Sequence, residues 1–221
     1  MVNLPNECFF KIFNYFRADF KNLYSFLLVN RHWCRIIVPI LWNEIANKLN
    51  NRKLINTCLL LLNAEEQILL IPFKIVLPNS PKPLFKYSNY VTSVGRLDYL
   101  DGSLDYLDDG VMNWLYNEGY KDVYSNEKDD NLAIAVKSSL IAMFLRMSKE
   151  LKYLGIRGMI YIKAIKNFCK NNIISLNLFN NNFDFEETKV LIESIGQNNT
   201  LSSLCISYNN LDSWSGKALS E

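Results

Sequence analysis

Two segments near the end of the 221-residue chain share one pattern of apolar residues and asparagine. The first, IISLNLFNNNF, begins at Ile173, and the second, LSSLCISYNNL, begins 28 residues later at Leu201. Five pairs of positions match at this spacing: Ile173 and Leu201, Leu176 and Leu204, Leu178 and Ile206, Asn181 and Asn209, and Phe183 and Leu211. A fixed period of this length predicts a repeat architecture, in which neighbouring units stack and bury one continuous core.

Each unit is expected to form a strand, a turn and a helix. Leu176 and Leu178 are two residues apart, so both point to the same side of a short strand. Asn181 follows three residues later, where its side chain can bond backbone groups as the chain turns. The segment EETKVLIESI then predicts a return helix, with these residues facing inward: Val190, Leu191 and Ile195.

A third, less regular unit is expected upstream, in LKYLGIRGMIYIKAIKNF. Leu151, Leu154 and Ile156 stand there in the same frame, 22 residues before Ile173, and Met159 replaces the asparagine. The last unit reaches SWSGKALSE with no polar capping unit after it. The sequence leaves open whether the final helix is short and frayed or the array is truncated.

The repeats resemble those of ribonuclease-inhibitor-type leucine-rich-repeat proteins. Because the leucines of each strand face the core, the residues between them are expected to face outward. These outward positions lie in residues 153–157, 175–179 and 203–207. Among them, Phe179 beside Arg157 is the only pair of large neighbouring side chains expected on that side. The candidate target-binding residues are Tyr153, Arg157, Asn177, Phe179 and Cys205. The alternative is that the repeats are only a structural remnant and that residues 50–150 bind the target.

The opposite end of the chain begins with an aromatic segment, LPNECFFKIFNYF, at residues 4–16. Pro5 suits the first turn of a helix, and the residues of one helical face follow: Phe9, Ile12, Phe13 and Phe16. Asp19 and Asn30 are expected to cap two further helices, and Pro39 is expected to end or bend the second of these. Charged residues interrupt the apolar run, so a signal peptide is not expected.

Residues 4–49 therefore predict three or four short helices, too few to bury all their aromatic side chains among themselves. Several motifs in this stretch resemble an F-box in order and spacing: Leu4-Pro5-x-Glu7, Ile12-Phe13, Leu27, Val29-Asn30-Arg31-x-Trp33 and Leu41-Trp42. The first helix is more aromatic than is usual in that family.

The resemblance implies a helical hook that docks on the Skp-family linker subunit of a cullin–RING ubiquitin ligase. The positions that match the family pattern at this contact are Leu4, Pro5, Ile12, Phe13, Leu27, Val29 and Trp33. The alternative is a small helical domain that only packs on its own chain.

Residues 50–150 match no recognisable pattern. LLLLNAEEQILL predicts a helix, the four prolines of IPFKIVLPNSPKPLFKY predict extended or loop structure, and AIAVKSSLIAMFLRM predicts a helix packed against the repeats. LDYLDG recurs seven residues later as LDYLDDG, but Asp98, Asp101 and Asp105 lack the spacing of calcium ligands. An exposed acidic edge is the simpler interpretation, and no tight calcium binding is expected.

The charge and the cysteines exclude several classes of function. The net charge of +2 gives no indication of nucleic-acid binding, although residues 98–130 carry ten acids against two lysines, a net charge of −8. Five scattered cysteines without a CxxC pair suit reduced thiols in the cytoplasm or nucleus, and neither a zinc site nor a membrane span is expected. His32 is the only histidine, and no glycine-rich phosphate loop is present, so no catalytic residue, cofactor or metal is expected.

Taken together, the sequence predicts a mixed α/β protein. An F-box-like hook (residues 1–49) precedes an irregular linker or degenerate repeats (50–150) and a short, irregular leucine-rich-repeat solenoid (151–221). The implied function is a non-catalytic substrate adaptor of an SCF-type ubiquitin ligase, bound to the Skp-family linker and through it to cullin–RING. Two rivals remain: an F-box scaffold outside ubiquitination, and a repeat-based binding module whose N-terminal helices are only a cap.

Overall fold

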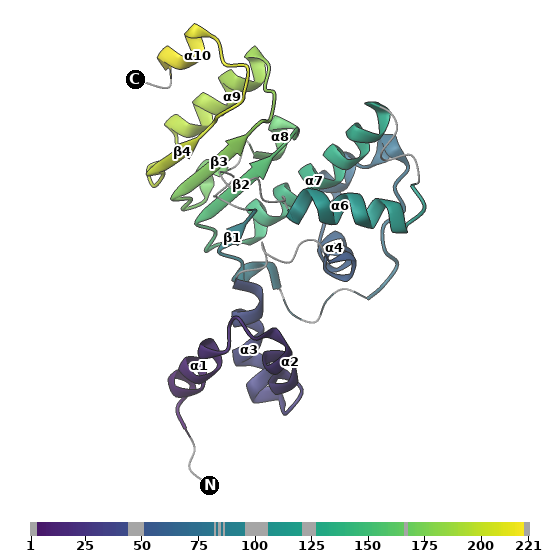
Figure 1. Cartoon of the computed structure of the whole chain (residues 1–221), viewed down its shortest axis with the longest axis vertical. Helices are drawn as coiled ribbons and strands as arrows, with labels where there is room; N and C mark the ends of the chain where they lie inside the picture. The colour runs from purple at the N-terminus through teal and green to yellow at the C-terminus, as the bar shows by residue number, and fades with distance from the viewer. Residues whose placement is uncertain are drawn as a thin grey trace.

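The computed structural model describes residues 4–43, 51–81, 83, 85, 87–95, 106–120, 127–165 and 168–218. Three helices project from one end of the molecule, and a small sheet with further helices makes up the rest (Figure 1). The chain is therefore an N-terminal helical region followed by mixed helix and a small parallel sheet. The acidic positions Asp98, Asp101 and Asp105 lie outside the described residues.

The projecting unit consists of α1 (Asn6–Tyr15), α2 (Phe20–Leu27) and α3 (Arg31–Asn43). The Asp19 carboxylate accepts a hydrogen bond from the Asn22 backbone N–H at 3.2 Å and caps α2. The Asn30 side chain accepts one from the Trp33 N–H at 2.8 Å, where α3 begins. Both predicted caps are thus confirmed.

Pro39 does not end α3, which continues to Asn43, so the first of the two expected effects was wrong and a bend at Pro39 stays a prediction. A proline inside a helix removes one backbone hydrogen bond and costs about 3 kcal/mol. Ile37, Val38 and Ile40 around it are all buried, and their burial offsets this cost.

The middle of the chain is mostly helical. Its elements are α4 (Arg52–Leu59), α5 (Ala64–Ile68), η2 (Ile71–Phe73), η3 (Tyr87–Tyr90), α6 (Tyr106–Asn117) and α7 (Glu127–Met147). LLLLNAEEQILL was expected to be one helix, but α4 ends at Leu59 and a new helix begins after Asn63. The Asn63 side chain and Glu66 cap the new helix reciprocally, through bonds of 2.9 and 2.8 Å to each other's backbone N–H.

Within the described residues, four parallel strands form the sheet in the order β1-β2-β3-β4. They are β1 (Ser93–Val94), β2 (Tyr153–Arg157), β3 (Ser175–Phe179) and β4 (Ser203–Cys205). No sequence pattern indicated β1, which lies nearest to the N-terminal helices (Figure 1). The connection between β2 and β3 contains α8 (Ile162–Ile165) and η4 (Phe168–Lys170), and the connection between β3 and β4 contains α9 (Phe185–Gly196). The helix α10 (Ser213–Ala218) follows β4. Leu154, Leu176 and Leu204 pair across β2, β3 and β4, so the predicted frame of the three strands is confirmed.

The two repeated asparagines occupy equivalent places. The Asn181 amide donates to the Ile156 carbonyl at 3.2 Å, and the Asn209 amide donates to the Leu178 carbonyl at 2.6 Å. The Asn209 side chain also accepts a hydrogen bond from the Asn181 N–H at 2.8 Å. Each asparagine therefore ties its own turn to the strand before it.

The described residues form two hydrophobic clusters in the interior. The larger one runs from Ile55 to Leu191, and α7 crosses it with buried residues on every side, including Phe144 at 0% exposure. Leu151 and Leu154 belong to the same cluster, so the core continues across the proposed boundary between residues 150 and 151, as expected for a helix packed against the repeats.

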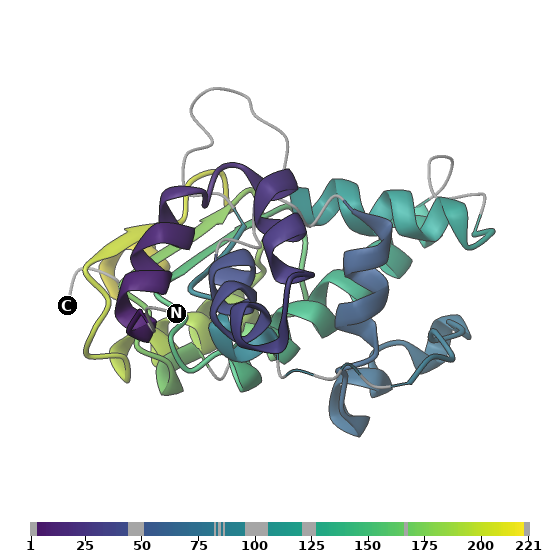
Figure 2. The same cartoon turned by 90° about the horizontal axis from the view of Figure 1, so that it is seen from below.

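The smaller cluster lies inside the projecting unit and is built on Phe13, Leu23, Ile37 and Ile40. The two clusters meet at the end of α3. There the Trp42 ring stacks on Tyr87 at 4.5 Å between centroids, and the Thr92 N–H donates to the Asn43 carbonyl at 3.2 Å. Seen along the long axis of the molecule, the three helices lie in front of the sheet and its helices (Figure 2).

Candidate functional site

The interior of the N-terminal unit is an aromatic cluster. The Phe13 ring lies 5.0 Å from the Trp33 ring and 5.9 Å from the Phe26 ring, between centroids, and only 2% of Phe13 is exposed. Leu27 and Trp33 are half-buried against the same cluster. Phe13 was predicted as a partner contact, and this needs correction, because a side chain buried in its own core cannot reach another protein.

Other apolar side chains of the unit face solvent. Leu4 is 42% exposed, Ile12 47%, Leu28 67% and Val29 57%, and Pro5 is exposed beside them. We call Leu4, Pro5, Ile12, Leu28 and Val29 the hook surface.

The two halves of the hook surface come from different elements but are held together. The Phe9 ring of α1 packs edge-on against the His32 ring at 5.4 Å and lies 6.0 Å from the Trp33 ring. This places the first turns of α1 beside the start of α3, which directly follows Leu28 and Val29. Leu28 was missed by the sequence analysis, although its place beside Val29 and off the core face of α2 was a usable signal.

The family comparison concerns this same unit. Residues 1–48 match the F-box-like family. F-box-like domains generally bind Skp-family linkers in SCF complexes and are typically non-catalytic adaptors. The match therefore supports an F-box-like domain on the segment that carries the hook surface.

No curated protein and no solved structure shows significant similarity to the chain.

A second cluster, half-buried at Arg157 and Phe179 and exposed at Tyr208, lies at the carboxyl ends of the strands. Arg157 and Phe179 pair in register, and the Arg157 guanidinium carbon lies 5.5 Å from the centre of the Phe179 ring. The Tyr208 ring lies 4.8 Å from Phe179 and is 76% exposed. We call Arg157, Phe179 and Tyr208 the strand-end cluster.

Tyr208 was not predicted from the strand pattern, because it lies in the turn that follows β4. Its φ of 59° is in the left-handed region, which strand alternation does not describe.

The remaining predicted residues of this face differ in accessibility. Tyr153 is 38% exposed at the other end of β2, and Cys205 is half-buried, with its sulfur 3.5 Å from the Ser207 hydroxyl. Asn177 is only 6% exposed, so its assignment to the contact surface needs correction. Its strand is paired on both edges, and the neighbouring Gly155 is buried too.

Cys58 and His32 lie in different surroundings. Burial raises the pKa of the Cys58 thiol to about 12, which disfavours the reactive thiolate at neutral pH. His32 is exposed and contacts the Phe9 ring. No three His, Cys, Asp or Glu side chains among the described residues come together as metal ligands.

No helix in the described ranges combines the length and apolar character needed to cross a membrane.

Proposed function

We propose that the chain is a non-catalytic substrate-recognition adaptor of an SCF-type cullin–RING ubiquitin ligase. The observation that carries the proposal is the match of residues 1–48 to the F-box-like family together with the apolar hook surface on that segment. Exposed leucine, isoleucine and valine side chains from two adjoining elements are the kind of surface that another protein covers. The proposed occupant is the Skp-family linker, which joins the chain to cullin–RING.

The C-terminal half is proposed to be a short leucine-rich-repeat array that holds the target. Three observations support it: the 28-residue period, the parallel register of β2, β3 and β4, and the equivalent bonds of Asn181 and Asn209. The strand-end cluster is its proposed contact, because arginine and aromatic side chains dominate binding hot spots.

The adaptor performs no chemistry in this proposal. It holds a target lysine near the charged ubiquitin-conjugating enzyme, so the transfer becomes effectively intramolecular and the local concentration of target rises to the millimolar range. The proposed compartment is the cytoplasm or nucleus, where free cysteines such as the five of this chain remain reduced.

Reconstitution separates this proposal from its rivals. The full chain is co-expressed with a Skp-family linker and a cullin–RING pair and then purified by a tag on the chain. The proposal predicts that linker and cullin co-purify and that captured targets become ubiquitinated. Capture of the linker without cullin indicates a scaffold outside ubiquitination, and capture of neither indicates a repeat module whose N-terminal helices are a cap.

The target contact is tested with the Arg157→Ala/Phe179→Ala double variant. The matched control is Phe185→Ala/Lys189→Ala, which removes an exposed aromatic and a cation from α9. Captured proteins are compared by mass spectrometry, and the proposal predicts their loss only from the first variant. Undiminished capture by a folded Arg157→Ala/Phe179→Ala protein would move the contact elsewhere, first to residues 50–150.

A further inference from the structure

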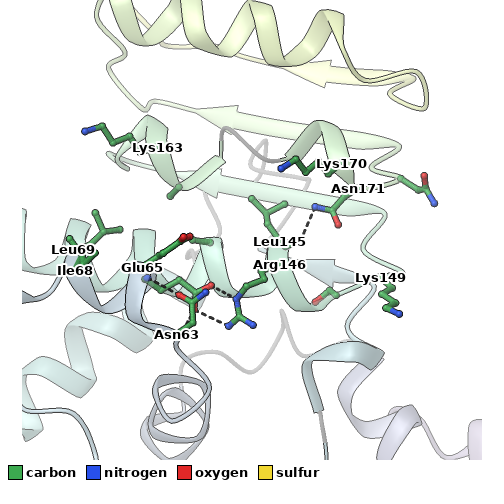
Figure 3. Close-up of a pocket in the computed structure, with 15 residues that line it drawn as sticks. Asn63, Glu65, Ile68, Leu69, Leu145, Arg146, Lys149, Lys163, Lys170 and Asn171 are labelled. Atoms are coloured by element: carbon green, nitrogen blue, oxygen red, sulfur yellow. Dashed lines mark hydrogen bonds and ion pairs between the residues drawn. The ribbon is translucent and has the colours of Figure 1, made fainter.

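A cleft of about 880 Å³ lies away from both surfaces described so far. One side is formed by α5 and the C-terminal half of α7, and the other by α8, η4 and the residues that follow η4 (Figure 3). None of the strand-end or hook-surface residues lines it. Its size is in the range of ordinary ligand-binding pockets.

The wall formed by α5 is held firmly in place. The Arg146 guanidinium donates two hydrogen bonds to the Glu66 carboxylate, at 2.6 and 2.9 Å, and a third to the Leu61 carbonyl at 3.0 Å. The Ser139 hydroxyl donates to the Glu66 carbonyl at 2.9 Å. The cleft is thus preformed, and a ligand does not have to order this wall.

Three lysines border the cleft. Lys163 and Lys170 come from the α8 and η4 side, and Lys149 comes from the turn after α7 (Figure 3). All three are exposed, and none forms a salt bridge or side-chain hydrogen bond with the described residues. Because Arg146 already neutralises Glu66, Glu65 is the single carboxylate among the described lining residues that can offset the three ammonium groups.

Apolar side chains complete the lining. Ile68 is 59% exposed at one edge, and Leu69, Ala142 and Leu145 lie along the cleft. None of the described lining residues is aromatic. Single-stranded nucleic acids are usually held by aromatic stacking platforms as well as by cations, so this lining fits an acidic peptide better than an oligonucleotide.

We propose that this cleft binds an acidic peptide segment, with carboxylates or phosphates on Lys149, Lys163 and Lys170 and an apolar side chain near Ile68. The cleft is a peptide site additional to the strand-end cluster. It does not depend on docking of the linker, so the proposal can fail or succeed independently of the proposed function.

The test measures fluorescence anisotropy of labelled peptides with the purified full chain at low salt. The acidic probe holds six glutamates and one leucine, the neutral probe has glutamine at each glutamate, and a third probe has phosphoserine at three of them. The proposal predicts that the acidic or the phosphorylated probe binds, that the neutral probe does not, and that added salt weakens binding. The tighter of the two anionic probes identifies the anionic group that the cleft prefers.

The decisive variant is Lys149→Gln/Lys163→Gln/Lys170→Gln. We expect it to bind the anionic probe about tenfold more weakly, because each exposed ion pair contributes only a modest amount. The matched control, Lys21→Gln/Lys74→Gln/Lys189→Gln, changes the net charge equally at exposed sites outside the cleft and is expected to bind like the wild type. Unfolding midpoints of both variants verify that the fold is intact.

Four results would overturn the proposal. The first is equal affinity of the cleft variant and the control variant for the anionic probe. The second is equal binding of the neutral and anionic probes by the wild type, and the third is no binding of either anionic probe by the wild type. The fourth is a labelled oligothymidine that binds more tightly than both anionic peptides and whose binding is lost in the cleft variant, which would assign the cleft to nucleic acid.

Discussion

Neighbouring residues of α1 have opposite roles. Phe13 is 2% exposed and Ile12 is 47% exposed, because successive residues of a helix point about 100° apart. The F-box motif includes both positions, so the motif match alone could not separate a core residue from a contact residue. The separation required the rings that surround Phe13, which come from α2 and α3.

Replacing Phe13 by alanine is expected to destabilise the N-terminal unit by about 3–5 kcal/mol, because a buried aromatic side chain leaves a cavity. Ile12→Ala is the control, and its effect on stability is expected to stay within about 0.5 kcal/mol. Hydrogen exchange of the α1–α3 amides measures both effects. Equal protection of these amides in the two variants would contradict the assignment of Phe13 to the core.

The cysteines are expected to differ in reactivity. Burial raises the pKa of Cys58 to about 12, whereas Cys8 is exposed on α1. In native protein at pH 8, iodoacetamide should therefore modify Cys8 and leave Cys58 unmodified until the chain is unfolded. Mass spectrometry of the digested protein distinguishes the two sites, and native labelling of Cys58 as fast as Cys8 would show that the core around it is open.

At the scale of elements, the features set by residues close in sequence were predicted correctly, and the features set by tertiary contacts were not. The caps Asp19 and Asn30 and the leucine frame of the strands follow from residues close in sequence, and the structure confirms them. The break between α4 and α5 also had a local signal, the Asn63–Glu66 capping box, which the leucine run obscured. The two-residue strand β1 is too short for any periodicity, and only its pairing with β2 makes it a strand.

Asn209 is expected to contribute more to the free energy of unfolding than its neighbour Asn210. Its amide donates to the Leu178 and Ile206 carbonyls at 2.6 and 2.9 Å, and its oxygen accepts from the Asn181 N–H. Asn209→Ala leaves these partly buried groups unpaired and should lower the free energy of unfolding by roughly 1–3 kcal/mol. Asn210→Ala, at an exposed position, should cost less than about 1 kcal/mol. Urea unfolding compares the two variants, and equal losses would argue against a tying role for Asn209.

At the scale of the whole molecule, long-range contacts decide the organisation. The Trp114 indole donates to the Asn56 side chain, 58 residues away, and Arg146 reaches the Leu61 carbonyl across 85 residues. Such pairs carry no sequence signal. Residues 50–150 therefore had no recognisable pattern, although they, α7 included, supply most of the larger hydrophobic cluster. The N-terminal unit has its own cluster and was therefore recognisable from its own residues.

A fragment of residues 151–221 is expected not to fold alone. Leu151, Leu154 and Ile156 are each 0% exposed in a core that they share with α7, and removal of α7 would expose them to water. Circular dichroism of the fragment should show no cooperative thermal transition, whereas the full chain should show one. A cooperative transition in the fragment would show that residues 151–221 form a domain that folds by itself.

The most direct test of the central claim is the affinity of the full chain for a Skp-family linker, measured by isothermal titration. Ile12→Ala/Val29→Ala removes two side chains of the hook surface, and Ile71→Ala/Val76→Ala removes the same two residue types at exposed positions elsewhere. We predict a loss of about 2 kcal/mol of binding free energy, roughly 30-fold in affinity, for the first variant and no loss for the second. Wild-type affinity of a folded Ile12→Ala/Val29→Ala protein, or no binding by the wild type, would contradict the account.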